Sequence, residues 1–232
     1  AALSTANSQS YNMIPDDKVP YVPGYVGAQI SNTSEMTFDG VDDIFDLSSE
    51  VLFDSTKSFS VSAWVKLTGY SPSLYPSIAK FKTDTSTGWT FGLSNASAYA
   101  GVFFGSSTNF ARGRTDGDIS ADFIGVWKHI CLVFDGVDKA ALSSYKIYVD
   151  GSNIGLTGAG AFSTVSNTSS VIGGQPGNKF NGQIDEVAIF DKALTADQIK
   201  FDLYNATTTG KTADIENNTN LPTPVAWYRM GD

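Results

Sequence analysis

The sequence contains one cysteine, Cys131, and one histidine, His129, among its 232 residues. A chain with a single thiol forms no internal disulfide, and a Cys/His zinc site would need at least two more ligands of those types. A histidine-dependent catalytic triad would have to use His129. We interpret His129 as a structural residue on a strand and Cys131 as a buried, inert thiol. These shortages exclude several classes of enzyme before any motif is considered.

Basic residues are also in short supply, with 15 lysines and arginines against 24 aspartates and glutamates and a formal net charge of −9. A protein that binds nucleic acid through its phosphates needs a basic surface, so nucleic acid is not expected among the partners. No run approaches the roughly 18 apolar residues of a transmembrane helix, so membrane insertion is not expected either. The 41% of hydrophobic residues nevertheless predicts a substantial core.

Most of the chain has the alternation and the β-forming composition of strands. The clearest example is 59–67, in which Phe59, Val61 and Val65 share one face. Further strands are predicted at 89–93, 99–104, 127–134, 145–149 and 184–190. Asp-Gly dipeptides, which favour tight turns, separate several of them. We therefore predict an all-β sandwich or jelly roll.

One helix is predicted near the C-terminus. Residues 195–198 (Thr-Ala-Asp-Gln) have the spacing of a capping box, in which the first and last side chains satisfy each other's free backbone N–H groups. Ile199 and Leu203 then lie on one side of the helix, four residues apart. We expect the helix to end near residues 204–205.

The two ends of the chain differ from its middle in composition. Residues 1–27 carry three prolines and two glycines and predict an extended arm. Residues 28–204 form the predicted jelly-roll domain, and residues 205–232 a polar linker with a C-terminal strand. The sequence leaves open whether residues 225–232 complete this domain or begin another segment.

Four segments resemble, in order, the laminin-G-like or concanavalin A-like jelly-roll family. They are 36–43 (MTFDGVDD), 59–66 (FSVSAWVK), 127–136 with 146–151 (WKHICLVFDG, KIYVDG), and 172–195 with its central run FNGQIDEVAIF. The resemblance covers about residues 36–204. It implies a two-sheet antiparallel jelly-roll sandwich with one short helix near the C-terminus. The family includes lectins, polysaccharide-binding modules, glycosidases, adhesion domains and spacers, so the fold does not fix the function.

The resemblance sets a test for catalysis. Hydrolases of this superfamily resemble one another in a strand motif, Glu-x-Asp-x-Glu, that places three carboxylates on one face. The chain has four glutamates, no two within four residues of each other: Glu35, Glu50, Glu186 and Glu216. Asp185 and Glu186 are adjacent on their strand, so regular alternation directs them to opposite faces. We therefore predict that the protein is not an enzyme.

A structural calcium ion is the expected cofactor. Ca²⁺ takes about six to eight oxygen ligands, and Asp39, Asp42 and Asp43 cluster just before a strand. The resemblance implies that this segment lies near the late strand that carries Asp185, where relatives often hold one structural Ca²⁺. We expect Asp39, Asp43 and Asp185 to bind it. The alternative is that Asp39 serves its turn and that Asp42 and Asp43 are solvated.

The segment 69–114 is the expected place for a carbohydrate site, which uses aromatic rings and a few polar groups on loops. Strand aromatics in this segment, Phe103 among them, are assigned to the core. The ligand-binding candidates lie nearer turns and are expected to be exposed: Tyr70, Tyr75, Arg112 and Arg114. Two alternatives remain, that the tyrosines are rim residues and that the arginines pair with acids on a partner.

The resemblance and the missing catalytic motif favour one function, and a second function remains as the alternative. The first is a non-catalytic jelly-roll module of an extracellular or virion-associated protein that binds a glycan or a cell-surface polysaccharide. The alternative is a structural assembly subunit, such as a virion decoration or appendage protein, whose arms contact neighbouring subunits. Similar domains are common in secreted bacterial proteins and in phage structural proteins, so we expect an extracellular or virion-surface location.

Overall fold

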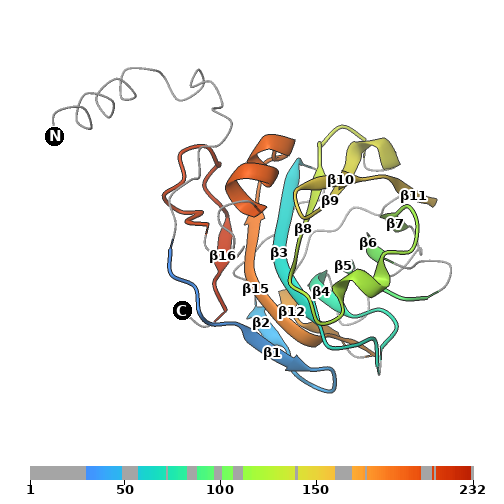
Figure 1. Cartoon of the computed structure of the whole chain (residues 1–232). Coiled ribbons are helices and arrows are strands. Elements are labelled where there is room, and N and C mark those ends of the chain that lie inside the picture. Colours follow the sequence, from blue (N-terminus) through green and yellow to red (C-terminus); the bar gives the residue numbers. More distant parts are fainter. Residues whose placement is uncertain are drawn as a thin grey trace, which may run out of the picture.

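Two antiparallel seven-stranded sheets pack face to face in the computed structural model (Figure 1). The structure describes residues 30–48, 57–71, 73–82, 88–96, 101–106, 112–138, 141–159, 169–175, 177–204, 211 and 213–230. The first sheet has the strand order β1-β15-β3-β8-β9-β10, with β16 also paired to β15, and the second has the order β11-β7-β6-β5-β4-β12-β2. The predicted jelly-roll sandwich is confirmed.

The first sheet consists of β1 (Met36–Asp39), β3 (Phe59–Leu67), β8 (Lys128–Phe134), β9 (Tyr145–Val149), β10 (Ser152–Ile154), β15 (Asn181–Phe190) and β16 (Ala226–Tyr228). The second consists of β2 (Phe45–Ser48), β4 (Ser77–Lys82), β5 (Gly88–Ser94), β6 (Gly101–Ser106), β7 (Arg112–Thr115), β11 (Leu156–Ala159) and β12 (Ser169–Ile172). A short pair, β13 (Gly174–Gln175) and β14 (Asn178–Lys179), and the helical segments η2 (Ser120–Phe123), η3 (Leu142–Ser144) and η4 (Gln198–Tyr204) complete the described elements.

The main core lies between the two sheets. Because alternate residues of a strand face the same side, Val61 and Val65 of β3 point inward, and Phe91 and Phe104 of the second sheet meet them from across the sandwich. All four are fully buried. Burial of each such side chain contributes about 1.5–3 kcal/mol, so this core fixes which face of each strand points outward.

The outer face of the first sheet, the side away from the main core, carries a second apolar layer. Cys131 and Val133 of β8 point into it, which explains the continuous apolar run of that strand, since both of its faces are covered. The layer is completed by Leu194, Ile199 and Leu203 around the helix and by Ala213, Ile215 and Leu221 of the C-terminal segment. Figure 1 shows the helix and the red C-terminal segment beside β15 and β3.

The predicted helix and its capping box are confirmed. The Thr195 backbone N–H donates to Gln198 Oε1 at 2.9 Å, and the Gln198 N–H donates to Thr195 Oγ1 at 3.2 Å. Ile199 and Leu203 are buried. The winding over Gln198–Tyr204 is that of a π-helix. No helix among the described residues is long and apolar enough to cross a membrane.

The C-terminal segment packs on the first sheet. A polar linker was expected at 205–224, but Ala213, Ile215 and Leu221 are buried there, because the apolar residues of this stretch fill the outer layer. β16 pairs with Val187–Ile189 of β15, so the terminal strand adds to this sheet. The expected arm, 1–27, lies outside the described residues, and how the chain divides into domains stays a prediction.

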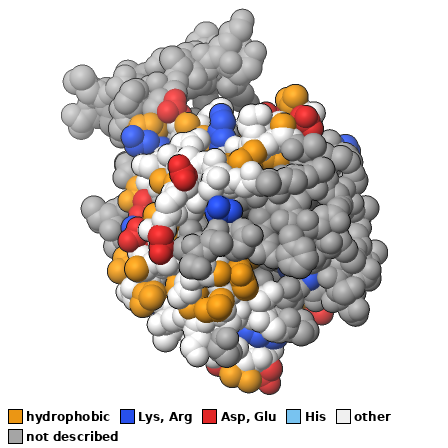
Figure 2. Space-filling model, turned by 90° about the vertical axis from the view of Figure 1, so that its right-hand side faces the viewer, with side chains coloured by type: hydrophobic (Ala, Val, Ile, Leu, Met, Phe, Trp, Pro, Cys, Tyr) orange, Lys and Arg blue, Asp and Glu red, His pale blue; other side chains and the backbone are white. Residues whose placement is uncertain are grey.

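Side chains of both charges are interspersed on the described surface. On the face shown in Figure 2, acidic and basic groups are scattered between polar and hydrophobic ones, and hydrophobic groups gather in the lower part of the view. Leu74, Ile124 and Val126 are about half exposed, at 51%, 46% and 53%. Single exposed aliphatic side chains of this kind are ordinary on protein surfaces.

Candidate functional site

A β-bulge interrupts β15 at its acidic pair. Glu186 and Val187 together lie opposite the single residue Ala63 of β3. Glu186 has a φ of 49°, in the left-handed region. The extra residue brings the side chains of both Asp185 and Glu186 to the outer face of the first sheet. The expectation that they point to opposite faces is wrong, because strand alternation does not hold through the bulge.

Asp185 is fully buried and is held in an ion pair. Its Oδ2 accepts a hydrogen bond from Lys211 Nζ at 2.9 Å, and its Oδ1 accepts one from the Glu186 backbone N–H at 2.8 Å. Lys211 Nζ also lies 3.3 Å from Glu35 Oε2. Burial raises the pKa of Asp185, and the Lys211 ammonium opposes that rise. Both oxygens of Asp185 are therefore already engaged within the protein.

Glu186 is 4% exposed and binds three residues from outside its own strand. Asn32 Nδ2 donates to its Oε1, and Trp227 Nε1 donates to its Oε2 at 2.5 Å. Arg229 Nε lies 3.8 Å from Oε1. Burial raises the pKa of Glu186 to about 7, the charge of Asp185 adds to the rise, and the contacts with Trp227, Asn32 and Arg229 oppose it.

A small cavity lies between Glu186 and the C-terminal segment, with room for about one water molecule. Glu186, Lys211 and His129 line it. His129 Nε2 is 2.8 Å from Ser62 Oγ, while its buried Nδ1 has no hydrogen-bond partner among the described residues. Burial lowers the pKa of His129 to about 3, so the imidazole is neutral. A glycosidase needs carboxyl groups on both sides of a sugar, and a sugar ring does not fit here.

The sequence interpretations of His129 and Cys131 agree with this arrangement. His129 is 1% exposed and packs tilted against the ring of Trp64, with 5.3 Å between ring centroids. Cys131 is fully buried, and burial raises the pKa of its thiol, which keeps it protonated. Both residues belong to the packed outer face of β8.

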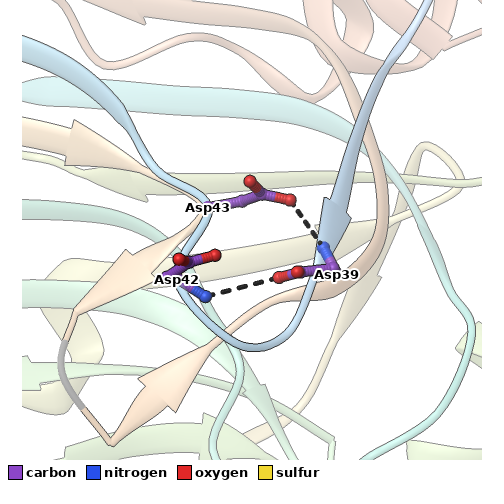
Figure 3. Close-up of side chains that lie close together, drawn as sticks. All are labelled: Asp39, Asp42 and Asp43. Carbon is purple, nitrogen blue, oxygen red and sulfur yellow. Dashed lines mark hydrogen bonds between the residues drawn. The ribbon is translucent and has the colours of Figure 1, made fainter.

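The acidic loop between β1 and β2 forms a second cluster (Figure 3). Carboxylate oxygens of Asp39, Asp42 and Asp43 lie within 4.8 Å of one another, and all three residues are exposed. Asp39 Oδ1 accepts backbone N–H groups of Val41 at 2.7 Å and of Asp42 at 3.3 Å. The Val41 hydrogen bond, with other backbone N–H groups, lowers the pKa of Asp39. Asp39 thus serves its turn, as the alternative reading holds.

The expected calcium ligands do not form one set. Asp39 lies opposite Asn181 of β15, four residues before Asp185, and Asp185 is bound to Lys211 instead. This separation corrects the expectation for Asp185. The ammonium of Lys179 donates to the Asp42 carbonyl at 2.9 Å, so a cationic group already touches the loop. Calcium binding by Asp39 and Asp43 stays a prediction, which calorimetric titration with CaCl₂ tests.

The four ligand-binding candidates do not form one site in the structure. Tyr70 is 8% exposed and belongs to the main core, and its hydroxyl donates to the Ser120 carbonyl at 3.0 Å. Burial raises the pKa of that hydroxyl. The expectation that Tyr70 is exposed is wrong, because the segment that contains η2 packs over it. The side chain of Arg112 lies outside the described part of the chain.

The two remaining candidates lie on the outer face of the second sheet. Tyr75 is half-buried, and its ring meets the edge of Phe103 at 6.2 Å between centroids and 85° between planes. Phe103 of β6 lies opposite Arg114 of β7, which is also half-buried. Phe103 is 8% exposed, so it is buried as its sequence suggested. It lies on the face of β6 opposite the main core, because the neighbouring Phe104 points into that core.

The chain belongs to the concanavalin A-like lectin/glucanases superfamily, whose family model matches residues 39–200. No curated protein matches the chain significantly.

Solved structures share the fold at low sequence identity. Domain 4 of AbnA, a GH43 extracellular arabinanase from Geobacillus stearothermophilus solved with arabinotriose, has a TM-score of 0.56 and 23% identity, over 76% of this chain and 81% of that one. The native heptameric SAP-like pentraxin from Limulus polyphemus has a TM-score of 0.53 and 17% identity, over 85% and 88%. These likenesses establish the jelly-roll fold.

Proposed function

We propose that the protein is a non-catalytic module that binds a glycan or a cell-surface polysaccharide on the outer face of its second sheet. One observation carries the proposal: the half-buried ring of Tyr75 is held edge-on by Phe103, with Arg114 on the neighbouring strand. An aromatic ring offers an apolar surface for the C–H face of a sugar, and a guanidinium donates hydrogen bonds to hydroxyl or carboxylate oxygens. Domain 4 of the arabinanase, a structural neighbour, was solved with arabinotriose.

The non-catalytic part of the proposal rests on how the buried acids are used. Asp185 is engaged by Lys211, and Glu186 by Asn32, Trp227 and Arg229. The cavity beside them has room for about one water molecule. A sugar bound at Tyr75 would lie on the other sheet of the sandwich from this acidic pair.

Titration calorimetry with a glycan retained in an array screen tests the proposed site. Tyr75→Ala and Arg114→Ala should each weaken binding about tenfold or more, since each removes a group that the proposal assigns to the ligand. Lys146→Ala, at an exposed position of β9 on the first sheet, is the matched control and should leave affinity unchanged. Unchanged affinity in both site variants, with unchanged melting temperatures, would contradict this placement.

The proposal includes an extracellular or virion-surface location, because a protein at such a location can contact cell-surface polysaccharides. The alternative is an assembly subunit whose arms contact neighbouring subunits. The structure supports this alternative less than the sequence did. Residues 213–221 pack on the first sheet. The remaining support for this alternative is the predicted arm 1–27, which lies outside the described residues. Solution mass measured by light scattering separates a free-standing module from an assembly subunit.

A further inference from the structure

The loop that carries Tyr75 is tied to the turn between β13 and β14. The Ser73 hydroxyl accepts the Tyr75 backbone N–H at 3.0 Å and donates to Asn178 Oδ1 at 3.3 Å. Ser73 is 6% exposed, so its side chain is fixed between the two segments. Asn178 of β14 therefore lies beside the loop that presents the ring of Tyr75, although the two residues are far apart in the sequence.

The amide of Asn178 is held by its oxygen and offers its nitrogen. A serine hydroxyl has one proton to donate, and donation of that proton to Asn178 Oδ1 directs the amide nitrogen to the other side. Asn178 is half-buried, and its Nδ2 donates to no other residue in the part of the chain that the structure describes. Its direction is set before a ligand arrives, so less freedom is lost when a ligand oxygen accepts from it.

The positions of Tyr75 and Asn178 suit a chain of sugars. The ring of Tyr75 meets Phe103 of β6, whereas Asn178 is bonded at Ser73, so the two contacts are offset along the loop. Two residues of extended chain span about 7 Å at most, which keeps Asn178 within reach of a neighbouring sugar unit. Leu74, between Ser73 and Tyr75, is 51% exposed and adds apolar surface to the same loop.

We propose that Asn178 forms a second sugar subsite, so that the module binds a chain of sugars with one unit at Tyr75 and the next at Asn178. This inference rests on the proposed glycan site and adds the ligand class, which is an oligosaccharide or polysaccharide recognised along its chain. The turn that carries Asn178 is also held on its other side, because the Lys179 ammonium donates to the Asp42 carbonyl at 2.9 Å.

Titration calorimetry of the full chain tests the subsite with fragments of one, two and three sugar units cut from a glycan retained in the array screen. Affinity should rise about threefold or more from the single sugar to the longer fragments, because a longer fragment gains the hydrogen bond from Asn178. Equal affinity for all fragments, with Tyr75→Ala still weakening binding, would overturn the subsite and leave the proposed glycan site in place. If Tyr75→Ala weakens none of them, the proposed site and the subsite both fail.

Variants assign the gain to one amide. Asn178→Asp keeps an oxygen for the Ser73 hydroxyl and removes the NH₂ donor, so it should lose most of the gain with fragment length. Asn153→Asp, at an exposed position of β10 on the first sheet, makes the same chemical change and should retain the gain. A full gain in Asn178→Asp would overturn the proposal.

A measurement on the unaltered chain decides if Asn178→Asp does not fold. The ¹H–¹⁵N signals of the Asn178 side-chain NH₂ group should shift on addition of the three-unit fragment and stay in place with the single sugar. Any other pattern of shifts contradicts the subsite.

Discussion

The side chain of Ser62 is the hydrogen-bond partner of His129. Its Oγ lies 2.8 Å from Nε2, and both residues are almost fully buried. Ser62→Ala should lower the free energy of unfolding by about 1–3 kcal/mol, because it leaves a buried ring nitrogen unsatisfied. Urea denaturation measures the change. Ser152→Ala, at an exposed position of β10 in the same sheet, is the control and should stay within about 0.5 kcal/mol.

The neutral state of His129 opposes the effect of Glu186 on overall stability. A histidine whose pKa falls from 6.5 to about 3 on folding contributes stability above 6.5 that is lost as the pH falls toward 3. Glu186 contributes stability at low pH that is lost as the pH rises from 4.5 to about 7. Between pH 4.5 and 6.5 the two effects partly cancel. His129 and Glu186 line the same cavity, so urea denaturation across this pH range measures the sum of the two effects.

Among the elements, the corner between β12 and β14 allows a matched pair of glycine substitutions. Gly173 and Gly177 have φ values of +87° and +81°, so alanine is strained at both. A Cβ on Gly173 would lie 2.0 Å from the Phe38 ring, whereas a Cβ on Gly177 would meet nothing within 4 Å. Gly177→Ala should cost about 1–2 kcal/mol. Gly173→Ala should cost at least about 1–3 kcal/mol more, because it overpacks the core.

Thermal and urea unfolding of the two glycine variants measure that difference. Similar losses of stability in both variants would mean that Phe38 moves aside without cost, and would contradict the tight packing of this buried ring against Gly173. The comparison isolates the steric effect, since both variants share the same backbone strain.

Local signals made the elements predictable. The strand 59–67 followed from its alternation, and the helix from the capping box at Thr195 and Gln198. The bulge in β15 was not predictable, because the residues around Glu186 continue an ordinary strand pattern and only their pairing with β3 reveals the extra residue. The burial of Tyr70 was missed for the same kind of reason, since it depends on the distant Ser120.

At the scale of the whole molecule, the fold was predicted more completely than the sites. The order of segments along 36–204 is typical of the jelly roll and predicted both sheets. Lys211, which contacts Asp185, lies in a stretch whose polar composition predicted a linker. Trp227, which contacts Glu186, lies in the predicted C-terminal strand, which the sequence did not assign to this domain or to another segment. Their roles depend on contacts with β15 across the outer layer, and no local pattern encodes such contacts.

A glycan-array screen of the purified chain, followed by a reducing-sugar assay on every glycan retained, tests the central claim most directly. The account predicts retention of at least one glycan class without release of product during prolonged incubation. Failure to retain any glycan in a broad array, or release of product that Glu186→Gln abolishes, would contradict a non-catalytic carbohydrate-binding module.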